Sequence, residues 1–182
     1  MKLLKRCRSL LGSLLVGASL LLATLGAAQA FAAAEELPRE AVLPLHLASK
    51  AAAAAQEKCR QDGYRVSVAV VDRAGVLKVL MRADGAGPHT TESSSKKAFT
   101  AASLRRPTSE LAELVAKMPA FQGLRDMDQR VLILGGGLPI EMGGEVVGGI
   151  GVGGAPGAHL DDACAQAGLD SIGAASKAAG GK

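Results

Sequence analysis

The chain has very few large side chains from which to build a hydrophobic core. Its 182 residues include one Tyr, three Phe and no Trp, whereas glycine occurs 23 times. Burial of apolar surface stabilises a fold by roughly 25 cal/mol per Å², so each small side chain contributes little. A chain of this composition gains stability where backbones pack closely and where subunits share surfaces. We therefore expect one closely packed domain that associates with further copies of itself.

The N-terminal residues have the three parts of a secretory signal peptide. Residues 9–25 form an uncharged, leucine-rich stretch, and residues 28–30 (Ala-Gln-Ala) match the small-x-small pattern that signal peptidase recognises. Four cations precede the stretch: Lys2, Lys5, Arg6 and Arg8. The stretch is shorter than the about 20 apolar residues of a membrane-spanning helix. We expect export to the periplasm or the cell exterior, with no stable membrane insertion after cleavage.

The charge balance changes when the signal peptide is removed. The precursor has 21 Lys and Arg against 17 Asp and Glu, a net charge of +4. Four of these cations lie in residues 1–30, so the mature chain is neutral and lacks the basic surface of a nucleic-acid binder. The predicted organisation is a signal peptide (1–30), a lead-in segment (31–44), one folded domain (45–175) and a flexible tail (176–182).

Hydrophobic periodicity predicts an α/β fold of the α+β type. Small residues recur at helical spacing over residues 45–61. Val66, Val68 and Val70 alternate along a first strand, and Leu77, Val79 and Met81 share one side of a second. The remaining predicted elements are helices at 92–104, 108–118 and 159–177, an irregular segment at 120–130, and about three strands from residue 131 to 152. Thr91 and Thr108 are the expected N-caps.

Several motifs that suggest chemistry have simpler interpretations. Residues 149–154 read G-x-G-x-x-G, but we expect neither an immediate helix nor a later parallel strand, so we interpret the glycines as sites of close packing. The three histidines have no partner at metal-ligand spacing, and no Cys-x-x-Cys-His occurs. We predict no metal site and no catalytic residues. Cys59 and Cys164 either pair as a disulfide or lie as two buried thiols.

A set of spaced motifs resembles the GlcG/HbpS-like family of haem-binding proteins, with most likeness to its secreted haem-binding member. The likeness covers essentially the whole mature chain. The motifs are residues 70–77 (VVDRAGVL), 82–88 (RADGAGP), 97–102 (KAFTAA), 107–111 (PTSEL), 135–140 (GGGLPI), 148–156 (GGIGVGGAP) and 161–162 (DD).

This resemblance implies a profilin-like single domain with a mostly antiparallel, five-stranded sheet covered by helices, which forms homo-oligomers that are often octamers. It implies non-covalent binding of haem b for haem or iron scavenging or for redox sensing under oxidative stress, with a sensor kinase or transporter as partner. The alternatives are an oligomeric accessory protein, or an enzyme acting on haem or a small organic acid. The missing nucleophile, general base and metal cluster favour a non-enzymatic protein.

A haem site needs an axial ligand, an apolar slot and cations for the propionates. The candidate iron ligands are His46, His89 and Thr100, the last of which matches the threonine of the family's Lys-Ala-x-Thr-Ala helix. Met81 and Tyr64 are less favoured ligands. The candidate partners of the propionates are Lys97, Arg82, Arg105 and Arg106.

Overall fold

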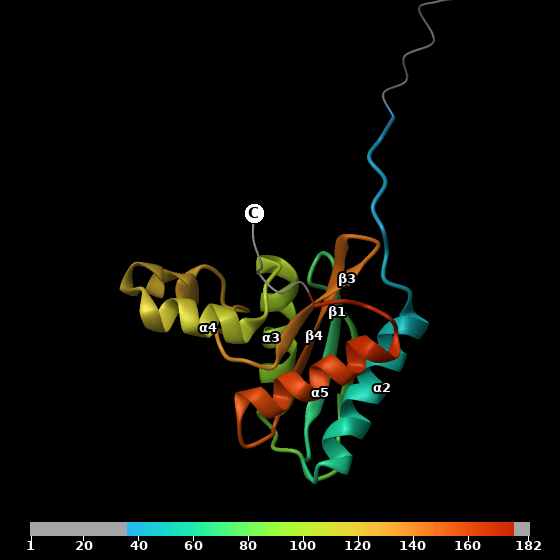
Figure 1. The fold of residues 1–182 in the computed structure, drawn as a ribbon, viewed down its shortest axis with the longest axis vertical. Coiled ribbons are helices and arrows are strands. Elements are labelled where there is room, and N and C mark those ends of the chain that lie inside the picture. Colours follow the sequence, from blue (N-terminus) through green and yellow to red (C-terminus); the bar gives the residue numbers. More distant parts are fainter. Residues whose placement is uncertain (1–35, 177–182) are drawn as a thin grey trace, which may run out of the picture. The chain divides into compact units, whose positions relative to one another are not determined.

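The computed structural model describes residues 36–176 (Figure 1). The predicted signal peptide (1–30) and residues 177–182 of the predicted tail lie outside the described residues. The elements are α2 (Leu45–Gln61), β1 (Ser67–Asp72), β2 (Leu77–Arg82), α3 (Thr90–Leu104), α4 (Thr108–Lys117), the 3-10 helix η1 (Pro119–Asp126), β3 (Gly137–Met142), β4 (Glu145–Gly153) and α5 (Ala158–Ser171). The predicted α+β class with an antiparallel sheet is confirmed.

The sheet has the strand order β2-β1-β4-β3, and all neighbours are antiparallel. Within the described residues it has four strands, so the expected fifth is wrong. Residues 131–134, predicted to begin a strand, are irregular. The Leu132 N–H donates to Thr100 Oγ1 at 2.9 Å, and Ile133 is buried beneath α4. Because that backbone bonds to a side chain of α3, it does not pair with a strand.

Helices cover both faces of the sheet, with α2 and α5 on one face and α3 on the other (Figure 1). Val68 and Val70 of β1 belong to the core beneath α2 and α5. Ala69 and Val71 point the other way and pack against Ala98 of α3. The alternation predicted for the first strand is therefore confirmed.

The second strand follows its predicted alternation only in part. Val79 and Met81 both pack against the core beneath α2 and α5, so these two share a side as predicted. The register shifts between Val70 and Val71, so that Leu77 lies opposite Val71. This bulge turns Leu77 to the α3 face, and the prediction that it shares a side with Val79 is wrong.

Two helix starts differ from the prediction because threonines bond elsewhere. Helix α3 begins at Thr90, and the Thr91 hydroxyl donates to the Pro88 carbonyl. The Thr108 hydroxyl bonds both backbone groups of Gly137 instead of capping α4. Neither helix has a side-chain cap hydrogen bond, so both predicted N-caps are wrong.

The last helix and the segment after α4 also differ from the prediction. The last helix ends at Ser171 rather than residue 177, because the backbone turns at Gly173, whose φ is +66°. Ala175 then forms a single antiparallel bridge with Glu141 at the edge of β3, so the tail predicted at 176–182 begins directly after a paired residue. Much of the segment predicted to be irregular at 120–130 forms η1.

Glycines of β4 allow α3 to rest directly on the sheet backbone. A Cβ placed on Gly149 would collide with the Ala98 carbonyl oxygen, and one on Gly151 with the Ser94 carbonyl oxygen. The prediction that these glycines serve close packing is confirmed, and the neighbour is a helix of the same chain.

We expect Gly151→Ala to lower the free energy of unfolding by about 2–3 kcal/mol, because α3 must move away from β4. Urea unfolding measures the change. Gly123→Ala is the matched control, since Gly123 is exposed and has no atom within 4 Å of an added Cβ. Equal stability of the two variants would contradict the close approach of α3.

Candidate functional site

A pocket of about 230 Å³ opens on the α3 face beside the turn between β1 and β2. It draws its walls from the sheet, from α3 and from the segment after η1. Its lining residues are Val71, Gly75, Leu77, Glu92, Ser95, Lys96, Phe99 and Arg130.

The floor of the pocket is apolar because of two backbone features. The bulge brings Leu77 to the same face as Val71. Gly75, with φ +77°, makes the hairpin turn and leaves space that the Phe99 ring fills, since a Cβ there would lie 2.5 Å from Phe99 Cδ2. The turn glycine is thus required both for its left-handed backbone and for the ring packed against it.

Arg130 forms one side of the pocket mouth. Its guanidinium carbon lies 4.0 Å from the centroid of the Phe99 ring, a cation–π contact. Its Nε and Nη2 donate to the Asp128 carboxylate at 3.0 and 2.7 Å. The side-chain hydrogen bond from Arg130 lowers the pKa of Asp128 to about 2, so both groups stay charged at neutral pH. Nη1 has no hydrogen bond within residues 36–176.

Lys96 places a second cation on the pocket wall. Its ammonium lies 2.9 Å from the Glu92 carboxylate one turn earlier in α3, and this hydrogen bond lowers the pKa of Glu92. The Ser95 hydroxyl donates to the Thr91 carbonyl at 2.8 Å. The pocket therefore combines an apolar floor with two cations and the Glu92 carboxylate, a lining that suits an amphipathic ligand. None of its lining residues is His, Cys, Met or Tyr.

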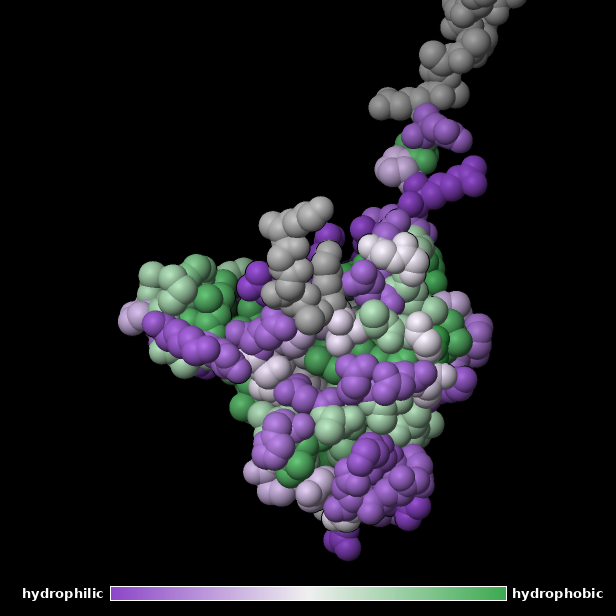
Figure 2. Space-filling model, viewed as in Figure 1, coloured by the Kyte–Doolittle hydropathy of each residue, from purple (hydrophilic) through white to green (hydrophobic). Residues whose placement is uncertain are grey.

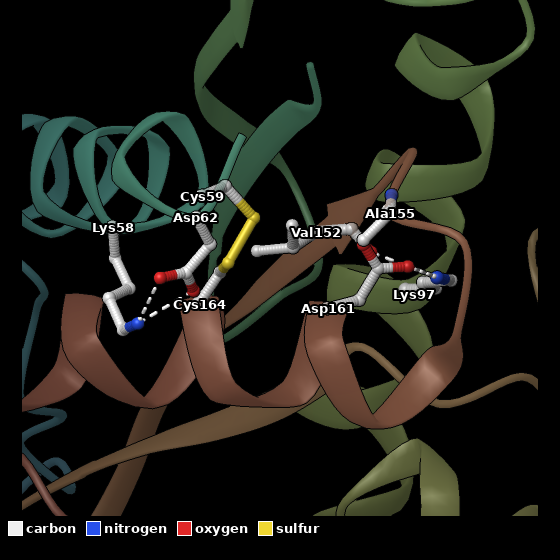
Figure 3. Close-up of a disulfide and its surroundings, with 8 residues drawn as sticks. All are labelled: Lys58, Cys59, Asp62, Lys97, Val152, Ala155, Asp161 and Cys164. Atoms are coloured by element: carbon white, nitrogen blue, oxygen red, sulfur yellow. Dashed lines mark hydrogen bonds and ion pairs between the residues drawn. A yellow bond between two sulfur atoms is a disulfide. The ribbon is translucent and has the colours of Figure 1, made fainter. Parts of the chain in front are cut away.

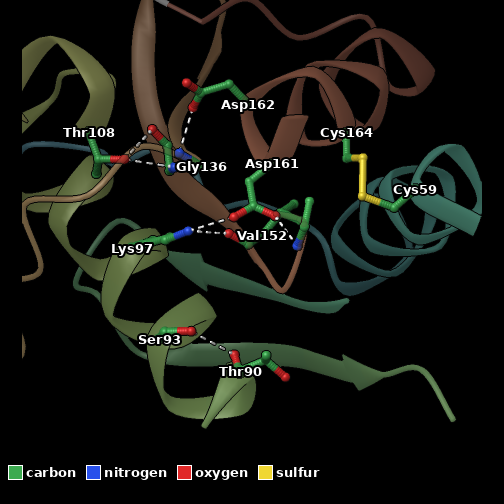
Figure 4. Close-up of polar contacts among 12 residues, drawn as sticks. Cys59, Thr90, Ser93, Lys97, Thr108, Gly136, Val152, Asp161, Asp162 and Cys164 are labelled. Carbon is green, nitrogen blue, oxygen red and sulfur yellow. Dashed lines mark hydrogen bonds and ion pairs between the residues drawn. A yellow bond between two sulfur atoms is a disulfide. The ribbon is translucent and has the colours of Figure 1, made fainter. Parts of the chain in front are cut away.

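A second polar centre lies between α3 and α5 and is buried (Figure 4). Lys97 is 2% exposed, and its ammonium donates to Asp161 Oδ2 and to the Val152 carbonyl, both at 2.9 Å. Asp161 also accepts the Ala155 N–H. Burial raises the pKa of Asp161, against the opposing pull of Lys97.

The same centre holds the glycines where β3 begins. The Gly136 N–H donates to Asp162 Oδ1 at 2.6 Å, and the Gly137 N–H donates to Thr108 Oγ1 at 2.8 Å (Figure 4). A Cβ on Gly136 would lie 2.8 Å from Lys97 Nζ. These contacts join α3, α4, α5 and β3, so the centre is a structural junction.

The two candidate histidine ligands lie far from each other. His46 is exposed in the first turn of α2, and His89 is exposed just before α3. Near His46, Leu43 packs beside Gly148, which pairs with the last residue of β1. Next to His89, the Thr90 hydroxyl forms a hydrogen bond with that of Ser67, the first residue of β1. The histidines thus stand at opposite ends of β1, and their helices cover opposite faces of the sheet.

The other predicted site residues also lie outside the pocket lining. The Thr100 hydroxyl donates to the Lys96 carbonyl and accepts the Leu132 N–H. Arg82 is exposed and donates to the Ala86 carbonyl. Arg105 and Arg106 are exposed after α3, where Arg105 has φ +54°.

Met81 and Tyr64, the two less favoured candidate ligands, pack against the core beneath α2 and α5. The residues that sequence reasoning missed are Phe99, Lys96 and Arg130. Phe99 stood within the KAFTAA motif, where its large ring was the available signal. No sequence pattern pointed to Arg130, because its guanidinium lies over the Phe99 ring only in the folded chain.

Cys59 and Cys164 form a disulfide that joins α2 to α5 (Figure 3). Both residues are completely buried, and 105 positions separate them in the sequence. The sequence left open whether these cysteines pair or remain two buried thiols, and in the structure they are paired.

Two features are absent from residues 36–176. No group of three or more His, Cys, Asp or Glu side chains is arranged to hold a metal ion. No helix in that part of the chain has the length and hydropathy needed to cross a membrane.

Comparison with known proteins gives consistent matches. Residues 43–170 match the family model described as "Haem degrading protein HbpS-like". GlcG of Escherichia coli is 35% identical over 112 residues, which are 61% of this chain and 81% of GlcG. A double mutant of HbpS from Streptomyces reticuli is 47% identical, with a TM-score of 0.70 over 76% of this chain and 92% of that one. The PduOC:heme complex is 29% identical, with a TM-score of 0.69 over 75% and 99%.

Proposed function

The chain belongs to the HbpS-like family, and from this premise we propose that it is an exported, non-enzymatic protein that binds haem b without covalent attachment. The observation that carries the proposal is the pocket on the α3 face. Its floor of Val71, Leu77 and Phe99 suits the apolar macrocycle, and its cations Lys96 and Arg130 suit the propionates. The protein would serve in haem or iron scavenging or in redox sensing.

The size of the pocket indicates how much of the haem one subunit covers. Pockets that enclose a drug-sized ligand measure about 300–1,000 Å³. The pocket here, at about 230 Å³, encloses only part of a macrocycle. A haem bound there would remain partly exposed or would be covered by another copy of the chain.

Exposed apolar side chains support a homo-oligomer, for which an octamer is our expectation. Figure 2 shows hydrophobic surface among hydrophilic residues over α4 and η1. Met118, Phe121 and Met127 are 46%, 38% and 60% exposed in this region. Shared surfaces would bury such residues in a chain that has few large side chains of its own.

Two features support the proposed export. Residues 1–30 have the composition of a signal peptide, and disulfides persist in oxidising compartments such as the periplasm. An exported haem-binding protein acts on the cell through a membrane partner, for which a sensor kinase or a transporter is our proposal.

Titration of haemin into the mature chain, from Phe31 onward, tests haem binding in the pocket. We expect a saturable shift of the Soret band, weakened about tenfold by Leu77→Glu, which places an anion in the slot meant for the macrocycle. Leu80→Glu is the matched control: Leu80 lies on the same strand and is 41% exposed, but it does not line the pocket. Equal binding by both variants, or no saturable shift at all, would overturn the assignment.

The same titration distinguishes the pocket from the start of α2. His46 belongs to the helix on the opposite face of the sheet from the pocket. His46→Ala should therefore leave the Soret shift nearly unchanged. Loss of the Soret shift in His46→Ala, with Leu77→Glu unaffected, would place haem at α2 instead.

An enzymatic role is the second candidate, favoured by the words "Haem degrading" in the description of the matched family. Addition of ascorbate to the haem complex in air-saturated buffer separates the two, because haem degradation consumes both a reductant and O2. A non-enzymatic binder keeps a Soret band, which only shifts when the iron is reduced. A degrading enzyme loses the band and releases iron.

A further inference from the structure

We propose that Arg130 and Lys96 select the ligand by its carboxylates, so that the pocket recognises the periphery of a tetrapyrrole and is indifferent to its metal. This inference rests on the proposed haem binding and names the residues of this chain that would confer specificity.

Arg130 is held in place while part of its guanidinium stays available. Asp128 accepts from Nε and Nη2, and the Phe99 ring supports the face of the guanidinium. An arginine has five N–H donors in a rigid fork that matches a carboxylate. The Nη1 donors, which have no partner in the described part of the chain, remain for a ligand carboxylate at the mouth of the apolar floor.

Lys96 can exchange its present partner for a ligand at little cost. Its pairing with Glu92 lies at the surface, where the side chains are 34% and 73% exposed. Exposed ion pairs of this kind contribute about 0–1 kcal/mol. A ligand carboxylate beside Lys96 would therefore compete readily with Glu92. Lys97 differs, because its ion pair with Asp161 is buried.

The lining offers no strong ligand to iron. Its only side chains with oxygen atoms are Glu92 and Ser95, and both already have hydrogen-bond partners within α3. Haem iron is ordinarily held by His, Cys, Met or Tyr, none of which lines this pocket. Affinity should thus come from the apolar macrocycle and the carboxylates.

Three ligands test the inference: haemin, metal-free protoporphyrin IX, and the dimethyl ester of protoporphyrin IX, which lacks both carboxylates. The chain has no Trp whose fluorescence could report binding. The absorption and fluorescence of the porphyrin therefore give the readout. We expect metal-free protoporphyrin IX to bind within about threefold of haemin and the ester to bind about tenfold more weakly.

Variants assign the selectivity to Arg130. Arg130→Leu should bind the free acid and the ester alike, and Arg130→Lys should restore part of the preference. Arg125→Leu is the control, because Arg125 is exposed and outside the pocket lining.

Each failure has a distinct signature. Equal binding of acid and ester by the wild type would overturn carboxylate selection while haem binding survives. Binding of haemin without metal-free porphyrin would overturn the indifference to metal. Absence of binding by all three ligands would overturn the proposed function itself.

Discussion

Replacement of both cysteines, as Cys59→Ala with Cys164→Ala, should lower the free energy of unfolding by about 3–5 kcal/mol. The disulfide closes a loop across 105 positions, and long loops lose the most entropy in the unfolded chain when they are cross-linked. The α2–α5 contact consists largely of small side chains, each of which adds little apolar burial to offset this loss. Gly168 of α5 packs directly on α2, where a Cβ would lie 2.7 Å from the Ala51 carbonyl oxygen.

Urea unfolding with and without dithiothreitol separates the contribution of the disulfide bond to stability from the contribution made by packing of the two sulfur atoms. The reductant should shift the midpoint of the wild type and leave the double variant unchanged. A wild-type midpoint that does not respond after full reduction, verified by thiol titration, would show that the bond contributes no stability.

Lys97→Met should destabilise the fold by about 3–5 kcal/mol, because it leaves the Asp161 carboxylate buried without its cation. Removal of both charges, as Lys97→Met with Asp161→Leu, should be much less harmful than the single change. Lys96→Met is the matched control: it is the next residue in the sequence, and its surface pair with Glu92 predicts a loss of at most about 1 kcal/mol. Thermal unfolding of the four proteins measures these differences.

The damage in Lys97→Met should depend on pH. Burial raises the pKa of Asp161, so a folded chain without Lys97 favours the protonated carboxyl. A carboxyl whose folded pKa lies above its unfolded value contributes stability at low pH that is lost as the pH rises through the folded pKa. The loss in Lys97→Met should therefore be smaller near pH 4 than near pH 8. A pH-independent loss no larger than that of Lys96→Met would contradict a buried ion pair.

Local patterns were sufficient to predict much of the fold. The alternation of Val66, Val68 and Val70 correctly predicted the first strand and the alternating directions of its side chains. The positive φ of Gly63 and Gly75 likewise belongs to a helix end and a turn, where glycine is favoured. These features depend on residues a few positions apart, because backbone periodicity and turn geometry are local properties. The α+β class follows from the order of such elements.

The candidate site depended on contacts between distant residues. A bulge opposite Val71 turned Leu77 to the pocket face, and folding placed Arg130 on Phe99. Lys96 and Lys97 are neighbours in sequence and both cationic, yet one lies at the surface and the other is buried against Asp161. Their different roles follow from which face of α3 meets the sheet and α5.

The sequence by itself determined the antiparallel α+β fold, the family likeness and the need for close packing by glycine. Only the tertiary structure decided that α3 is the helix resting on Gly151, that Cys59 pairs with Cys164, and which cations are available to a ligand. The physical reason is that periodicity fixes the direction of a side chain relative to its own element, whereas a site requires the elements themselves to be placed against one another.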